Sequence, residues 1–209
     1  GSTYSITETL TNPTAADITV TYSITPYTYG PNGNDDNGVG DDCPLGTPET
    51  ITIIVQPTPT ATLTAENAEI CSGSTDNAGV NVQTSVTEST SYNWTATYGA
   101  VTGGSGSGTS VDFDGDGSTY SITETLTNPT AADITVTYSI TPYTYGLNGN
   151  DDNGVGDDCP LGTPETITII VQPTPTAALM VENAEICSGS TDNAGVNVQT
   201  SVTESTSYN

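Results

Sequence analysis

The chain has 209 residues, of which 25 are Asp or Glu and none is Lys, Arg or His, so every formally charged side chain at neutral pH is negative. Such a polyanion lacks the cationic side chains that bind nucleic acid or an anionic membrane surface, and both classes of partner are excluded. The same absence removes the usual catalytic bases and the groups that activate Ser or Cys nucleophiles, so we expect no enzymatic activity.

The composition indicates a folded, all-β protein. Hydrophobic residues make up 33% of the chain and charged residues 12%, and no apolar run approaches the roughly 18 residues of a membrane-spanning helix. Thr, Ser, Gly, Asn, Val, Ile and Tyr are far commoner than good helix formers, which favours short strands joined by tight turns. We therefore predict neither a disordered tail nor direct insertion into a membrane.

The sequence is a tandem repeat. Residues 1–93 recur as residues 117–209 with four differences, which gives a period of 116 residues. This length suits one β-sandwich domain and is too long for a solenoid unit. Alternating prolines in residues 56–60 and 172–176 predict extended linkers. We therefore expect the C-terminal part of a domain at 1–59, a complete domain at 60–175 and the N-terminal part of a third at 176–209, as a window on a longer array.

Alternation of apolar and polar residues predicts six strands in the complete domain, in chain order at 61–66, 79–87, 90–98, 119–127, 133–141 and 166–171. Two buried faces are expected, one formed by Val80, Val82 and Val86 and the other by Ile134, Val136, Tyr138 and Ile140. The only tryptophan, Trp94, falls in the third strand, where immunoglobulin-like sandwiches bury an aromatic anchor. These features predict tandem immunoglobulin-like β-sandwich domains in a linear array.

Several short motifs follow one another along the complete domain. They are Ile70-Cys71-Ser72-Gly73, Tyr92-Asn93-Trp94-Thr95-Ala96, Thr125-Leu126-Thr127-Asn128, Val136-Thr137-Tyr138-Ser139-Ile140-Thr141-Pro142, a later cysteine and a Pro-Thr-Pro-Thr exit. This succession resembles the PKD-like (polycystic-kidney-disease-like) repeats of giant, gliding-associated cell-surface adhesins of Bacteroidota. The resemblance implies a β-sandwich, export across the outer membrane and display at the cell surface. A long acidic loop before the second cysteine departs from the family's usual short connection.

The first acidic motif precedes the fourth predicted strand. Asp112, Asp114 and Asp116 alternate, and Gly117 follows at the sixth position, as in calcium-binding loops. Position 12 of an EF-hand would be an acid but is Thr123 here, so we predict a calcium-loop-like turn between strands and not an EF-hand.

The second acidic motif lies before the last strand of each repeat. Its candidate ligands are Asn150, Asp151, Asp152, Asp157 and Asp158, and the earlier copy contributes Asp35, Asp36, Asp41 and Asp42. Carboxylate and amide oxygens suit Ca²⁺, whereas the alternative is a solvated acidic loop that needs no ion. Because no cationic side chain is present to relieve the repulsion, we expect structural Ca²⁺ at both motifs.

Each repeat carries two cysteines, Cys43 and Cys159 before the last strand and Cys71 and Cys187 after the first. An even number in a secreted repeat predicts disulfides. Cys71 with Cys159 is the simplest pairing, but a sandwich places these two connections at opposite ends. The alternative is a bridge from Cys71 to a cysteine of the next domain, and the sequence leaves both open. In that arrangement, Ca²⁺ at the joint would stiffen the array.

Two functions of different kinds are consistent with the sequence. In the first, the repeats form an extracellular fibre or stalk, stiffened by Ca²⁺ and disulfides, whose partners are adjacent repeats and other copies of the fibre. In the second, they form an adhesive module for a glycan or protein ligand, with Tyr27, Tyr29, Tyr143 and Tyr145 as contacts. A further possibility is that residues 176–209 complete, by strand complementation, the domain begun by residues 1–59 of another chain. The absence of Trp94 from such a hybrid argues against it.

Overall fold

The computed structural model describes residues 4–27, 46–74, 79–87, 90–109, 120–144, 161–189, 191, 195–203 and 205–207. These residues form strands, turns and extended segments, and none of them belongs to a helix that could cross a membrane. The chain divides into two compact units, Gly1–Thr58 and Pro59–Asn209. We refer to residues 60–175 as the complete repeat, to 1–59 as the leading segment and to 176–209 as the trailing segment.

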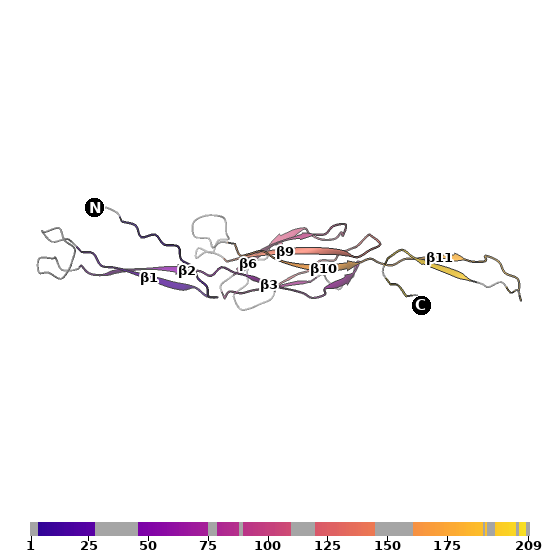
Figure 1. Cartoon of the computed structure of the whole chain (residues 1–209), viewed down its shortest axis with the longest axis horizontal. Coiled ribbons are helices and arrows are strands. Elements are labelled where there is room, and N and C mark those ends of the chain that lie inside the picture. The colour runs from indigo at the N-terminus through magenta and orange to yellow at the C-terminus, as the bar shows by residue number, and fades with distance from the viewer. Residues whose placement is uncertain are drawn as a thin grey trace. The chain divides into compact units, whose positions relative to one another are not determined.

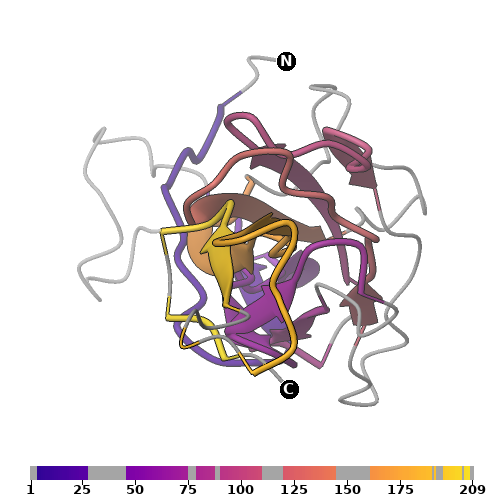
Figure 2. The same cartoon turned by 90° about the vertical axis from the view of Figure 1, so that its right-hand side faces the viewer.

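The complete repeat is a sandwich-like arrangement of two sheets (Figures 1 and 2). The three-stranded sheet has the order β3 (Ala61–Ala65), β5 (Val80–Thr84), β8 (Tyr120–Ile122). The five-stranded sheet has the order β4 (Glu69–Cys71), β10 (Glu165–Gln172), β9 (Ile134–Thr144), β6 (Thr90–Thr97), β7 (Ser107–Thr109). The structure therefore confirms the predicted all-β class and shows the sheets in a sandwich-like arrangement.

The chain enters the complete repeat at one end and leaves it at the other. β3 begins at Ala61, paired with Thr84, and β10 ends at Gln172, paired with Cys71. β4 pairs with β10 in parallel, whereas the other strand pairs of the complete repeat are antiparallel. We call the end at Ala61 the proximal end and the end at Gln172 the distal end.

The core lies between the two sheets and contains the predicted faces. Its fourteen buried side chains are Ala61, Ile70, Val80, Val82, Tyr92, Trp94, Val101, Ile122, Leu126, Val136, Tyr138, Ile140, Ile169 and Val171. Val86 is also buried, and Ile134 is half-buried against the cluster. Trp94 packs against Tyr138 with ring centroids 6.0 Å apart, as expected of an aromatic anchor.

The strands differ from the sequence-based expectation in three places. The predicted strand 119–127 stops at Ile122, and only an isolated bridge from Thr127 to Thr102 follows. β4 and β7 were not expected, since three residues are too few to show an alternating pattern. Gly108 of β7 lies against the Trp94 indole, where a Cβ would approach the indole nitrogen to 2.6 Å. Packing of β7 against the Trp94 indole therefore explains why its residues are small.

Both incomplete segments fold locally as the complete repeat does. In the leading segment, β1 (Ile18–Ile24) pairs with β2 (Glu49–Val55) in the register of β9 with β10, because Ile18↔Val55 corresponds to Ile134↔Val171. In the trailing segment, β11 (Ala177–Val181) pairs with β12 (Val196–Thr200) in the register of β3 with β5. The repeated sequence thus forms the same strand pairs in each copy.

Candidate functional site

Most of the predicted site residues lie outside the part of the chain that the structure describes. These are the cation candidates Asp112, Asp114, Asp116, Asn150, Asp151, Asp152, Asp157, Asp158, Asp35, Asp36, Asp41 and Asp42, and the cysteines Cys43 and Cys159. Among the described residues, no three His, Cys, Asp or Glu side chains come together as a metal-binding group. Their sites stay predictions from the sequence.

The described residues nevertheless show where the two acidic segments join the complete repeat. Segment 110–119 leaves after Thr109 and returns at Tyr120, and the strand directions of β7 and β8 put both residues toward the proximal end. Segment 145–160 leaves after Thr144, and Gly162 donates a 2.8 Å backbone hydrogen bond to Pro142 beside the carbonyl of Pro59. Both segments are therefore anchored at the end where the preceding linker arrives.

Cys71 lies at the other end of the complete repeat. It is the last residue of β4, it is exposed, and its thiol lies 3.8 Å from Oε1 of Gln172, the last residue of β10. Cys187 of the trailing segment is also exposed, and both described cysteines are free thiols. The parallel pairing of β4 with β10 thus positions Cys71 where the chain passes into the next linker.

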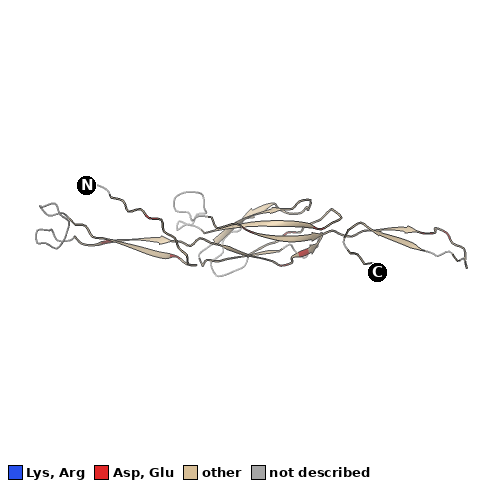
Figure 3. Ribbon diagram, in the orientation of Figure 1, with Lys and Arg blue, Asp and Glu red and all other residues tan. Residues whose placement is uncertain are grey.

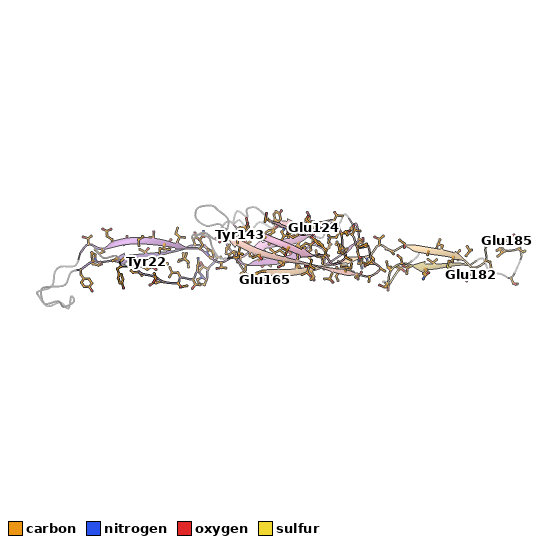
Figure 4. The ribbon with its side chains drawn as sticks, turned by 90° about the horizontal axis from the view of Figure 1, so that it is seen from above. Tyr22, Glu124, Tyr143, Glu165, Glu182 and Glu185 are labelled. Atoms are coloured by element: carbon orange, nitrogen blue, oxygen red, sulfur yellow. The ribbon has the colours of Figure 1, made fainter. Side chains whose placement is uncertain are left out.

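A carboxylate is buried between the sheets. Glu124 is 6% exposed and accepts hydrogen bonds from the hydroxyls of Tyr98, at 2.8 and 2.7 Å to its two oxygens, and of Tyr138, at 2.7 Å. The backbone N–H of Ser105 donates a further bond of 2.6 Å. Figure 4 labels Glu124 among the strands of the complete repeat. Because its oxygens are satisfied by donors, this carboxylate is a structural element of the core.

The environment of Glu124 raises the pKa of both tyrosines. Burial is the main cause for Tyr98 and raises its pKa to about 12; the hydrogen bond to Glu124 also raises this pKa, whereas the backbone bonds with Gly106 and Ser105 lower it. Burial is also the main cause for Tyr138, and its hydrogen bond to Glu124 acts in the same direction. Both hydroxyls therefore stay protonated as donors well above neutral pH.

Asn128 closes the distal end of the sandwich. Its Nδ2 donates to the carbonyls of Ala132, at 2.8 Å, and Val171, at 2.7 Å, while its Oδ1 accepts from the N–H and hydroxyl of Thr130. Next to this turn, Thr203 of the trailing segment donates a 2.9 Å backbone bond to the carbonyl of Ala131. The turn of residues 128–132 therefore lies at the distal end of the complete repeat and contacts the trailing segment.

The outer face of the five-stranded sheet carries rows of hydroxyl side chains. Thr97, Thr137 and Thr168 lie opposite one another across β6, β9 and β10, and Thr95, Ser139 and Thr166 form a second row. Their side chains are exposed or half-buried. Tyr143, a sequence-based candidate for ligand contact, continues the alternation of this face along β9 and is buried at 7% exposure. Tyr27 is exposed, and Tyr29 and Tyr145 lie outside the described residues.

One open hollow of about 360 Å³ lies in the trailing segment, lined by Pro175, Thr176, Ala177, Thr200, Ser205, Thr206 and Ser207. Thr206 and Ser207 correspond to Thr90 and Ser91, which are fully buried where β6 starts in the complete repeat. The hollow therefore exposes copies of residues that are covered in the complete repeat.

Acidic side chains are sparse along the described strands (Figure 3). Most of the carboxylates in the two acidic motifs fall in the segments anchored at the proximal end.

Neither a protein-family model nor a curated protein sequence matches the chain.

Proposed function

We propose that the chain is a structural repeat of an extracellular fibre or stalk-like surface adhesin, built from tandem immunoglobulin-like, PKD-like domains. The observation that carries this proposal is the parallel pairing of β4 with β10, because it sends the chain in at one end of the sandwich and out at the other. Domains with this connectivity, joined by short proline-rich linkers, extend in one direction. The placement of Trp94 on β6 also matches the buried tryptophan of immunoglobulin sandwiches.

Calcium is proposed to act at the joints between domains. Both acidic segments are anchored at the proximal end, so in an array their carboxylates belong to the end that meets the preceding domain. Carboxylates concentrated at a joint repel one another unless a cation is bound. Ca²⁺ fits the oxygen donors of both motifs, with Asp112, Asp114 and Asp116 in the first.

The disulfide is proposed to join neighbouring domains. β10 is about 23 Å long at the usual rise per residue, and it separates the anchor of the last loop at Gly162 from Cys71. Three residues reach at most about 11 Å, so Cys159 cannot bring its Cα within about 7 Å of that of Cys71, the limit for a bridge. This supports a bond from Cys71 to the cysteine that precedes the last strand of the following domain.

The proposal is tested with recombinant arrays of different numbers of the 116-residue repeat. Electron microscopy is expected to show particles whose contour length grows linearly with repeat number. Removing Ca²⁺ with EDTA is expected to shorten the persistence length, and Mg²⁺ is expected not to restore it. Compact particles would reject the fibre, and an unchanged persistence length in EDTA would reject calcium as the stiffening agent.

The alternative is a glycan- or protein-binding adhesive module. Burial of Tyr143 weighs against it, because this candidate contact residue is not accessible to a ligand. A glycan array probed with the complete repeat separates the two functions.

A further inference from the structure

The linker that follows β10 lies against the distal end of the complete repeat. The carbonyl of Gln172 accepts a 2.9 Å hydrogen bond from the N–H of Ser72, and the hydroxyl of Thr174 donates a 3.4 Å bond to the carbonyl of Ser72. Pro173, which stands between the two linker residues, is buried. The proline-rich linker is therefore fixed to the domain that precedes it.

The end of the same linker is bonded to the trailing segment. The N–H of Thr176 donates to the hydroxyl of Ser201, and the N–H of Ser201 donates back to the carbonyl of Thr176, both at 3.0 Å. The complete repeat has the same exchange between Thr60 and Ser85, with bonds of 2.9 and 3.0 Å. This attachment of the linker is therefore a regular feature of the repeat.

One residue separates the two anchored parts of the linker. Thr174 is bonded to the complete repeat and Thr176 to the trailing segment, and Pro175 stands between them. The proline ring holds φ at about −65°, and it restricts the residue before it to extended backbone. Little rotational freedom is therefore left in the backbone at this joint.

A second connection crosses the joint without using the linker. The N–H and the hydroxyl of Thr203 donate to the carbonyl of Ala131, at 2.9 and 3.2 Å. Ala131 belongs to the turn of residues 128–132, and the N–H of Asn128 in this turn donates a 2.9 Å bond to the hydroxyl of Ser72. Because Ser72 also holds the linker, the turn and the linker form one supported surface at the distal end.

Val202 is buried between these two attachments. It is 8% exposed, and no other side chain among the described residues of the trailing segment is buried. Val86, at the same position of the complete repeat, is 7% exposed, yet it is not one of the fourteen core side chains between the sheets. This position is therefore buried outside the sandwich core, and in the trailing segment its neighbours Ser201 and Thr203 are the residues that hold the joint.

We infer that the turn of residues 128–132 is a docking surface for the following repeat, and that the part it receives is the segment equivalent to residues 201–203. The docked joint holds consecutive repeats in one orientation without a cation. Its groups are backbone amides, hydroxyls and an apolar side chain, so neither chelation nor added salt weakens them as it would an ionic contact. This joint deepens the proposed fibre function and rests on it, because it supplies a source of stiffness besides Ca²⁺.

The test uses the full 209-residue chain in EDTA under reducing conditions, studied by nuclear magnetic resonance. The Thr203 amide is expected to exchange with solvent roughly 10- to 100-fold more slowly than in an unstructured peptide, the protection that burial of one valine supplies. Residual dipolar couplings of the β11–β12 hairpin and of the complete repeat are expected to fit one common alignment. Val202→Asp is expected to remove the protection of Thr203 and to give the hairpin smaller couplings with an alignment of its own.

Gln199→Asp is the matched control, because it adds the same charge at an exposed position three residues away. It is expected to change neither the exchange of the Thr203 amide nor the common alignment. Trp94 fluorescence during urea unfolding checks that the complete repeat stays folded in both variants.

A Thr203 amide that exchanges at the unstructured rate in the wild-type chain would overturn the docked joint. So would separate alignments of the hairpin and the complete repeat in EDTA. Equal release of the joint by Gln199→Asp would also overturn it, because added charge and not the loss of a buried contact would then be the cause. All three results come from a single chain, whereas the fibre function fails on the contour length of arrays, so the two failures are distinguishable.

Discussion

Glu124 accepts a 2.7 Å hydrogen bond from the Tyr138 hydroxyl in the core, and the same pair recurs at the surface, where Glu8 accepts a 2.8 Å bond from Tyr22. The sequence surrounding both pairs is identical, so the difference in burial isolates the effect of the domain around them. This duplication gives each core substitution a built-in control in the leading segment.

Glu124→Gln is expected to destabilise the complete repeat by about 2 kcal/mol, because one tyrosine hydroxyl or the Ser105 N–H would meet an amide N–H₂ in place of a carboxylate oxygen. Trp94 is the only tryptophan, so its fluorescence during urea unfolding reports on the complete repeat alone. Glu8→Gln is the control and is expected to leave this transition unchanged. Equal effects of the two variants would show that burial of Glu124 contributes nothing.

Alkaline pH is expected to destabilise the complete repeat. The pKa of Tyr98 is about 12 in the folded state against 10.0 for an ordinary tyrosine, so the unfolded chain loses this proton first. The stabilisation is therefore fully present below about pH 10 and is lost as pH rises through about 12. Tyr138 acts with the same sign. The free energy of unfolding, measured by fluorescence between these pH values, is expected to fall less steeply in Tyr98→Phe, and an unchanged slope would contradict this.

Asn128→Asp is expected to cost about 3 kcal/mol, since it removes two donors and turns a carboxylate toward the carbonyls of Ala132 and Val171. Asn12 makes the same contacts in the leading segment, with Nδ2 donating to Ala16 at 2.8 Å and Val55 at 2.7 Å. Asn12→Asp therefore adds the same charge and is expected to leave the Trp94 transition in place. The prediction fails if both variants shift it equally.

Gly104→Ala is expected to disturb the Glu124 cluster from a distance. A Cβ at this position overlaps the ring of Tyr98, so the ring has to move away from the carboxylate it serves. We expect a loss of stability comparable to that of Tyr98→Phe and little additional loss when the two are combined. Gly73, whose added Cβ meets nothing within 4 Å but whose φ is +68°, is a control for backbone strain alone. If the losses of stability caused by Gly104→Ala and Tyr98→Phe were fully additive, Gly104 would not act through the Glu124 cluster.

Non-reduced peptide mapping checks the cysteines. In the oxidised chain, a peptide linking Cys71 to Cys159 is expected to be absent, because β10 holds Cys71 at the distal end. In an array of three or more repeats, a link between consecutive repeats is expected instead. Recovery of the Cys71–Cys159 peptide from monomeric chain would contradict the interdomain bridge.

The main strands could be predicted because their alternation of Val, Ile and Tyr with Thr and Ser survives into the core, as Val136, Tyr138 and Ile140 show. β4 could not, because its three residues are ordered only by β10, about 100 positions later in the chain. Residues 185–187 have the sequence of β4 without that partner and form no strand. Whether such a short segment forms a strand depends on long-range pairing, which leaves no pattern in the local sequence.

The Glu124 cluster was missed, although a signal was present. Ile122, Glu124 and Leu126 alternate on one face, and the two apolar members are buried, so the acid between them shares their inward position. Alternation identifies the inward position but not the donors, which come from Tyr98, directly after β6, and from Tyr138 on β9. The acidic motifs, in contrast, are recognised from the types and spacing of their residues, and the cation sites stay predictions.

The parallel pairing of β4 with β10 also determines how the repeat would carry load. A pull applied through the linkers enters at Ala61 and leaves at Gln172, so it draws the two short paired stretches, Glu69–Cys71 and Ile170–Gln172, past each other along their length. Their hydrogen bonds lie across that direction and are strained together, whereas a hairpin pulled from its open end would lose its bonds one after another. In the proposed fibre, the same pairing of β4 with β10 would therefore make each repeat resist mechanical unfolding.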